Sequence, residues 1–519
     1  MASTSSQVEP QKKIDQFDSM MSHGLDNSTQ QVKMLRLSYY NTPSFNVTIE
    51  VGEKGCFSTD AHSLTWVERN MIAHRDVNDI RTITQPRELI FKLTEIFARA
   101  APNIEEVIVG GPGTIFDDTI HHWLVITKDF LLTLNKLTSM KSLKICRCQI
   151  DKDAVELIHS GQLTFITQLT KLSLNRVELD QPFYPAMLIG LMSNRLEELE
   201  IIDADLVYFG SLLVDQMRQH NKTFKKLTFD IFDVDVDKMI VARDNLIALN
   251  RVCDSMDLRF TAREKQNSAM QLGDNVFEMM GMKGCWLKLC SLTVDADDCD
   301  VRHFAEILSG LRLQKNLEYL KIGGLFVPEL CKILRQALRT EQKPKILHLR
   351  NTNPLLKIGE LIEELIEHLP SSLTGLELDG FPMNFDIMNM IQSKYAESLE
   401  KLAIKCVNQS DEMTLFPMCL NFKKLQCFST NMMIPLCDLH IVLAIKNLKK
   451  ATLVINKCSD VELNRVIESY NFVVFTKWQA NPFGSIFLEL IAKNSAAAPE
   501  MECMIEGTSA PTSERATRE

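Results

Sequence analysis

The 519-residue sequence lacks the features that mark secreted, membrane and disulfide-stabilised proteins. Its first twenty residues contain no apolar run of the kind found in signal peptides. No later stretch approaches the roughly 18 apolar residues of a membrane-spanning helix. The 14 cysteines include no C-x-x-C pair, and many occupy apolar positions of the pattern described below. We therefore expect a protein of the cytoplasm, or of cytoplasm and nucleus, that binds no membrane and keeps its cysteines reduced in the core.

Motifs of catalysis are missing as well. The sequence contains no nucleophile elbow, no H-E-x-x-H zinc motif and no protein-kinase set. A glycine-rich turn in VIVGGPGTIFDD, residues 107–118, carries neither G-K-[ST] nor G-x-G-x-x-G. We predict a protein that is not an enzyme and takes no cofactor or metal. A small-nucleotide enzyme built on this turn is a distant alternative.

The overall charge gives a weaker exclusion. The chain has 57 Lys and Arg against 67 Asp and Glu, a net charge of −10. This balance argues against a general binder of nucleic acid or of anionic membranes, although a local basic stripe remains compatible with it. Nucleic acid is therefore a less favoured partner than protein.

The strongest signal present is an internal repeat. A short apolar motif, L-x-x-L-x-L with Ile, Val or Phe as variants, recurs eleven times, with one further degenerate copy at Leu258. The other middle apolar residues are Leu143, Leu172, Leu199, Leu227, Leu292, Leu320, Leu347, Leu376, Leu402, Leu425 and Ala451. With Leu258 included, the 308 residues from Leu143 to Ala451 form 11 intervals, a mean of 28. A repeat of this length indicates a stack of identical supersecondary units.

Each unit predicts one strand and one helix. The alternation x-L-x-L is typical of a strand, because side chains alternate between faces at period two. In VRHFAEILSGL, residues 301–311, and LIEELIEHL, residues 361–369, the apolar residues instead follow helical i, i+3, i+4 spacing. A single unit of this kind cannot bury its own apolar face, whereas stacked units share a continuous core.

On these motifs the chain resembles the leucine-rich-repeat family, and its helical units resemble the ribonuclease-inhibitor-like class. The resemblance implies an α/β solenoid, or horseshoe, with parallel strands on the concave face and helices on the convex face. The family's repeats carry Asn or Cys at a rung position after the strand. Cys148 fits this rung, whereas other repeats have Val177, Ala204, Leu325 and Phe381 there.

Composition divides the chain into five segments. Residues 1–30 and 494–519 are polar and without periodicity, which predicts disordered tails. Residues 31–103, with a strand-like QVKMLRLSYY and a helix expected over 88–100, are predicted to form the N-terminal cap. Repeats of about 28 residues are expected over 104–475, and a C-terminal cap over 476–493.

Two acidic runs follow predicted strands. Their residues are Asp233, Asp235 and Asp237 in the first and Asp295, Asp297 and Asp298 in the second. Because equivalent positions of nearby repeats lie close together in a solenoid, they predict an acidic rim. A basic partner, a weakly bound divalent cation and a solvated surface without a ligand are the three interpretations.

The outward strand positions form the expected concave binding surface. At its centre we expect Tyr319, Ile346 and His348, a set of low charge suited to a protein contact, with Lys321 as a further binding residue. Toward the C-terminal end, the residue before the middle apolar position is Lys401, Lys424 and Lys450 in successive repeats, which predicts a lysine column. Ordinary solubilising lysines are the alternative interpretation.

The predicted function is that of an intracellular protein-binding scaffold acting through its concave face. The resemblance implies a ubiquitin-ligase substrate receptor as its most specific form, with ligase subunits among the partners. The sequence shows no F-box before the repeats and no S/T-L-x-x-x-C elongin-binding box. The alternative is a nucleic-acid-associated regulator that uses the basic column.

Overall fold

The computed structural model contains two compact units, one within residues 1–202 and one within residues 203–496. It describes the backbone of strands within 34–67 and most of residues 103–492. The longer gaps are 1–33, 42–44, 53–63, 68–102, 110–123, 178–194 and 493–519, and the remaining gaps are short segments between later elements. The expected tails, the expected helix 88–100 and most of the glycine-rich turn lie outside the described residues.

The first unit is built on a parallel sheet in which each strand pairs with the next. Its parallel strands are β1 (Met34–Asn41), β4 (Glu106–Val109), β6 (Ser142–Cys146), β8 (Lys171–Asn175) and β9 (Glu198–Ile202). An antiparallel hairpin, β2 (Phe45–Gly52) and β3 (Leu64–Val67), extends from β1, and β5 (Leu124–Ile126) pairs with β7 (Cys148–Ile150) in a second sheet. The helical segments are α3 (Lys128–Leu134), α4 (Lys152–His159) and η4 (Thr164–Gln168).

The second unit repeats the strand–helix alternation many times. Its parallel strands, in chain order and in pairing order, are β10 (Phe224–Phe232), β11 (Cys253–Ala262), β12 (Leu289–Ala296), β13 (Tyr319–Gly324), β14 (Ile346–Asn351), β15 (Gly375–Asp379), β16 (Lys401–Lys405), β17 (Cys427–Ile434) and β18 (Lys450–Ile455). The parallel series ends at β18, where β20 (Ile486–Ala492) pairs antiparallel with β18 and with β19 (Phe472–Gln479).

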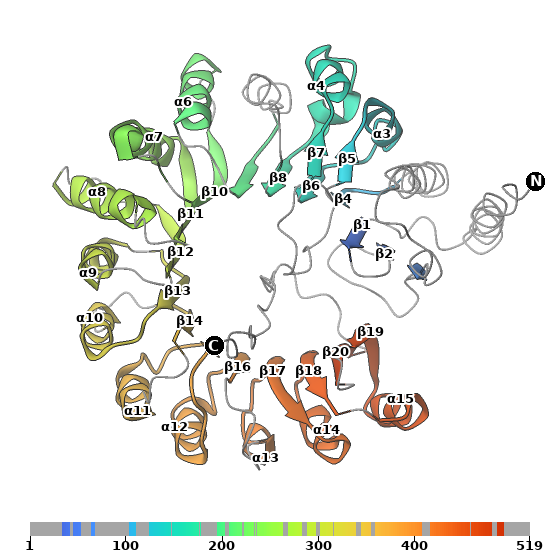
Figure 1. Ribbon diagram of the computed structural model, residues 1–519, viewed down its shortest axis with the longest axis vertical. Coiled ribbons are helices and arrows are strands. Elements are labelled where there is room, and N and C mark those ends of the chain that lie inside the picture. The colour runs from blue at the N-terminus through green and yellow to red at the C-terminus, as the bar shows by residue number, and fades with distance from the viewer. Residues whose placement is uncertain are drawn as a thin grey trace, which may run out of the picture. The chain divides into compact units, whose positions relative to one another are not determined.

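Helices connect these strands and lie on one side of them. They are α6 (Tyr208–His220), η5 (Val236–Lys238), α7 (Met239–Arg251), α8 (Ser268–Met282), α9 (Val301–Ser309), η6 (Gly310–Leu313), α10 (Pro328–Leu338), α11 (Gly359–His368), α12 (Phe385–Tyr395), α13 (Phe416–Cys419), α14 (Leu436–Leu443) and α15 (Asp460–Ser469). Figure 1 shows α7 to α15 along one side of β11 to β18. The alternating elements and the single parallel sheet are consistent with a repeat solenoid, as the sequence predicts.

The core lies between the strands and the helices. The middle apolar residues of β12 to β16 stand directly opposite one another in the ladder, and all are fully buried. They are Leu292, Leu320, Leu347, Leu376 and Leu402. Because these leucines stand opposite one another on successive strands and are all buried, one apolar stripe runs through the repeats. The predicted ladder is confirmed for these strands.

An asparagine side chain bonds to the backbone of neighbouring repeats at a position that the sequence pattern does not indicate. Asn351, at the end of β14, accepts a hydrogen bond from the Phe326 N–H at 3.4 Å and donates to the Gly380 carbonyl at 3.1 Å. It thereby joins the ends of three neighbouring repeats. Gly380 has φ +73°, and a Cβ there would overlap the carbonyl oxygen of Asn351. Glycine is therefore required at this turn for both its conformation and its size.

Replacing Leu320 by Ala tests the shared core. We expect the free energy of unfolding to fall by about 2–5 kcal/mol, because a fully buried leucine side chain leaves a cavity between β13 and its neighbours. Urea unfolding followed by circular dichroism measures it. The control is Val461→Ala on α15, where the side chain is 80% exposed and the loss should stay below about 0.5 kcal/mol. Equal effects of the two changes would contradict the buried ladder.

Replacing Gly380 by Ala tests the close backbone approach at the Asn351 turn. Gly161 has nearly the same conformation, φ +70°, but open space around its Cβ position. Gly161→Ala should therefore cost about 1–2 kcal/mol, the price of a left-handed alanine alone. Gly380→Ala should cost clearly more, because Asn351 must also move. Each variant is compared with the wild-type unfolding transition of its own unit, and equal losses would show that the turn tolerates a methyl group.

Candidate functional site

The candidate site is the sheet face opposite the helices, on strands β12 to β16. We call its outward-pointing residues the strand face. Three rows of the parallel register cross it. The rows are Tyr319, Ile346, Gly375 and Lys401; Lys321, His348, Glu377 and Ala403; and Asp295, Gly323, Arg350, Asp379 and Lys405. Neighbouring members of a row are one strand spacing apart, about 4.8 Å, so their side chains can pair.

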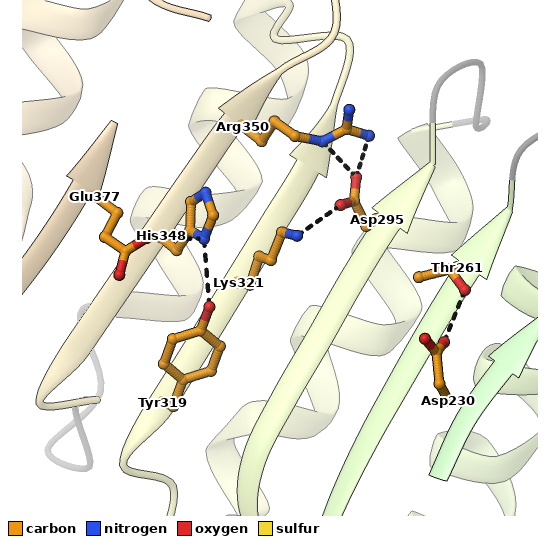
Figure 2. Close-up of polar contacts among 8 residues, drawn as sticks. All are labelled: Asp230, Thr261, Asp295, Tyr319, Lys321, His348, Arg350 and Glu377. Atoms are coloured by element: carbon orange, nitrogen blue, oxygen red, sulfur yellow. Dashed lines mark hydrogen bonds and ion pairs between the residues drawn. The ribbon is translucent and has the colours of Figure 1, made fainter. Parts of the chain in front are cut away.

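A buried carboxylate anchors one end of the strand face. Asp295 on β12 accepts from Lys321 Nζ at 3.0 Å and from Arg350 Nε at 2.9 Å, with Arg350 Nη2 also bound (Figure 2). Arg350 is two strands away, and it reaches Asp295 across Gly323. A Cβ at Gly323 would overlap Asp295 Oδ1. The glycine therefore leaves the space through which β12 and β14 are joined.

The two cations decide the ionisation of Asp295. Burial by itself would raise the pKa of this carboxyl, but the charges and hydrogen bonds of Lys321 and Arg350 outweigh burial and lower the pKa. Asp295 is 8% exposed and Lys321 is 6% exposed. Removing one partner from such a pair would leave an unpaired buried charge, which is strongly destabilising. The cluster therefore fixes the relative positions of three strands.

A second chain of polar contacts crosses the middle of the strand face. His348 Nδ1 lies 3.3 Å from Tyr319 Oη and 3.4 Å from Glu377 Oε2 (Figure 2). Glu377 Oε1 also pairs with Lys401. Burial raises the pKa of Glu377, but His348 and Lys401 outweigh it, and the pKa is lowered. The ionised carboxylate beside Nδ1 favours the tautomer with its proton on Nδ1. His348 Nε2 is then an acceptor.

His348 is neutral in this environment. Burial lowers its pKa to about 3, with Lys321 and Lys405 acting in the same direction and Glu377 and Asp295 opposing them. Its Nε2 atom is buried and has no hydrogen-bond partner. An unsatisfied buried acceptor costs roughly 1–3 kcal/mol. This atom is therefore an unmet acceptor at the centre of the strand face.

Asp379 lies in the third row, at the carboxyl ends of the strands. Burial raises the pKa of Asp379, although Lys405, Arg350 and Lys321 act in the opposite direction. Polar contacts continue on the neighbouring strands: the Thr261 hydroxyl donates to Asp230 Oδ1 at 2.8 Å, and Arg259 lies 3.5 Å from Asp257. Both members of the latter pair are buried. Polar and charged contacts thus occur on this face from β10 to β15.

The expected central residues lie together, as their spacing predicts. Tyr319 and Ile346 are adjacent in one row, and Lys321 and His348 are adjacent in the next. Sequence reasoning missed Gly323, Arg350, Asp379 and Lys405. These residues stand three positions after the middle apolar residue of their strands, so a third column, read from the same repeat, would have found them. Whether the strand face binds a partner stays a prediction.

The predicted lysine column is wrong at Lys424. In the ladder Lys401 stands opposite Cys427, and Cys427 opposite Lys450. Lys424 precedes β17 and is exposed in a turn. Both Leu425 and Phe428 are apolar and buried, and the strand takes Phe428 as its middle residue. The apolar pattern alone allowed either register.

The predicted acidic rim is wrong at Asp295, which is buried between two cations instead of exposed. Asp237 is exposed and belongs to the short helix η5, whereas Asp295 belongs to strand β12. The remaining rim residues, Asp233, Asp235, Asp297 and Asp298, lie outside the described residues. Within the described part of the chain, no three His, Cys, Asp or Glu side chains come together as metal ligands.

Burial disfavours ionisation of several thiols. Burial raises the pKa of Cys148 well above its usual value and raises that of Cys253 and Cys419 to about 12. Such thiols stay protonated at neutral pH and are poor nucleophiles. Cys148 donates to the Cys146 carbonyl at 3.2 Å, so the C-x-C segment is held by a local hydrogen bond.

Comparisons with known proteins do not assign this chain to a family. Neither a family model nor a curated protein matches this chain. The helices in the described ranges are all too short or too polar to cross a bilayer. The assignment of function therefore depends on the strand face.

The buried state of His348 predicts a specific pH dependence. An unfolded histidine has a pKa of about 6.5, so the unfolded chain binds a proton between pH 6.5 and 3 that the folded chain excludes. Stability contributed by neutral His348 is present above pH 6.5 and is lost as the pH falls. Lowering the pH from 7 to 5 should cost about 2 kcal/mol through this residue.

Urea unfolding of the wild type and of His348→Phe at both pH values measures this contribution. The variant keeps a planar ring but cannot titrate, so its loss of stability should be smaller by that amount. Asp295 and Glu377, whose pKa values are lowered, stay ionised over this range in the folded chain. Identical pH dependence of the two proteins, or an imidazole that titrates near pH 6.5 by NMR in the folded state, would refute the assignment.

Proposed function

We propose that this chain is a non-enzymatic, protein-binding scaffold of the leucine-rich-repeat, ribonuclease-inhibitor-like type, and that its partner binds the strand face. The repeat of about 28 residues and the parallel ladder of buried leucines support the family assignment. In such a solenoid the strands line the concave side of a horseshoe.

The observation that carries the proposal is the set of ion pairs that crosses β12 to β16. Asp295, Lys321 and Arg350 form one cluster, and His348, Glu377 and Lys401 form another. Side chains held in this way lose little conformational entropy when a partner binds. The partly exposed Tyr319 and Ile346 beside these clusters supply apolar contact area of the kind found at binding hot spots.

The same charges favour protein over nucleic acid. A nucleic-acid surface presents cations to successive phosphates, whereas here Arg350, Lys321 and Lys401 are already paired with the carboxylates of Asp295 and Glu377. A role as a ubiquitin-ligase substrate receptor in the cytoplasm or nucleus follows from the family resemblance alone, and we propose it as the specific form to be tested. Catalysis is not part of the proposal.

Affinity purification with quantitative mass spectrometry tests the function. The strand-face variant is Tyr319→Ala with Ile346→Ala, and the control is Tyr470→Ala, which removes a tyrosine that packs against His440 at the end of α15. Proteins that bind the strand face should fall at least tenfold in the first variant and be unchanged in the second. Ubiquitin-ligase subunits among the recovered proteins would support the specific role. Partners unaffected by the strand-face variant would contradict the proposed surface.

A further inference from the structure

The third row of the strand face contains a carboxylate that its own row leaves without an ion pair. Asp379 stands opposite Arg350 on β14 and opposite Lys405 on β16. Arg350 instead reaches across Gly323 to Asp295, on its other side. The Asp379 side chain forms no ion pair or hydrogen bond with any described residue, and it is partly exposed. A cation supplied by a partner can therefore reach this carboxylate.

The surroundings of Asp379 do not favour its ionised state. Burial raises the pKa of this carboxyl, and the charges of Lys405, Arg350 and Lys321 oppose the increase without cancelling it. Asp295 differs in this respect, because its two bound cations lower its pKa. The free chain therefore holds a carboxylate without the partner that its location requires, a condition that is typical of binding sites.

A second acceptor without a donor lies next to Asp379. His348 is one strand and one row away, so about 8 Å separates the two backbones. Figure 2 shows Nδ1 of His348 on the side of Tyr319 and the Nε2 end of the ring directed toward the carboxyl ends of the strands, where the third row lies. Nε2 is buried and has no hydrogen-bond partner, and the side chain as a whole is 10% exposed. Two unmatched acceptors thus border one small region of the strand face.

The chemistry of these two groups selects a hydrogen-bond donor. A partner carboxylate would add a third acceptor to the same region. A guanidinium group carries five N–H donors in one plane, so it can pair with a carboxylate and also donate to an acceptor beside it. The ammonium group of lysine concentrates its charge at one point and fits this arrangement less well. Reaching Nε2 requires neighbouring side chains to move, and rotamer changes of this kind are common at interfaces.

We propose that an arginine of the protein partner binds the Asp379 carboxylate and donates a second N–H to His348 Nε2. This inference rests on the proposed function and names the chemistry of the partner. The apolar contact expected at Tyr319 and Ile346 lies in the first row, four residues before the third row on each strand, which is about 13 Å. An extended partner segment that runs along the strands would therefore carry its arginine about four positions from a large apolar residue.

A peptide-display selection with the full chain tests the partner chemistry, with random linear 12-residue peptides as the probes. The recovered peptides should carry an arginine about four positions from a large apolar residue. Their affinity should fall about fivefold for Asp379→Asn and about threefold for His348→Phe. The matched control is Asp386→Asn, an exposed carboxylate in the first turn of α12, which should leave the affinity unchanged. Recovery of peptides without arginine, or of no peptide at all, would overturn the proposal.

Replacing the peptide arginine by citrulline, a neutral residue of the same shape, isolates the ion pair. The replacement should weaken binding to the wild type about fivefold. It should weaken binding to Asp379→Asn much less, because the charge that it removes then has no partner. Equal effects of citrulline on the two proteins would contradict a contact between the arginine and Asp379.

Two further measurements separate this site from a structural role and from the scaffold function. Asp379→Asn should leave the free energy of unfolding unchanged or raise it, because burial opposes the charge in the folded chain. A marked loss of stability would assign Asp379 to the structure and overturn the proposal. If natural partners are lost on changing Tyr319 and Ile346 but not on changing Asp379, the scaffold function stands and this inference fails.

Discussion

The spacing of hydrogen-bonded parallel strands, about 4.8 Å, is the constraint on which the rest of this structure depends. On the inner side it sets leucines such as Leu320 and Leu347 directly opposite one another, and both are buried, so each repeat helps to complete the core of its neighbour. On the outer side it sets charged residues of successive repeats within ion-pairing distance. Arg350 can bridge two spacings to Asp295 because the intervening residue is Gly323. Core and surface are thus two consequences of one register.

Burial makes the ion pairs of the strand face important for stability. A charge removed from water is unfavourable unless a partner and hydrogen bonds compensate it. Asp295 meets this condition with two cations, and Glu377 meets it with Lys401 and the neighbouring imidazole. His348 instead stays neutral, so it needs no counter-charge, but its Nε2 atom is left without a hydrogen-bond partner. The strand face is therefore rigid in its ion pairs and incomplete at one acceptor, which is the condition expected of a preorganised binding surface.

The repeat was predictable because apolar periodicity reports burial directly. Leu292, Leu320, Leu347, Leu376 and Leu402 form the ladder at the positions that the motif indicates. The predicted register was wrong at β17, because Leu425 before the strand and Phe428 within it both fit the apolar motif. The pairing of Asp295 was not predictable from its acidic run, because its partners lie 26 and 55 residues away in sequence. Contacts of that kind appear only when the register of three strands is known together.

The ion pairs of the strand face also determine what a partner could gain there. From β12 to β15 most cations and carboxylates pair with one another, so a partner would gain shape and apolar contact but little net charge attraction. Tyr319 and Ile346, which are partly exposed, would supply that apolar contact. Without long-range attraction the association rate is not raised, so the affinity of such a complex would depend mainly on slow dissociation.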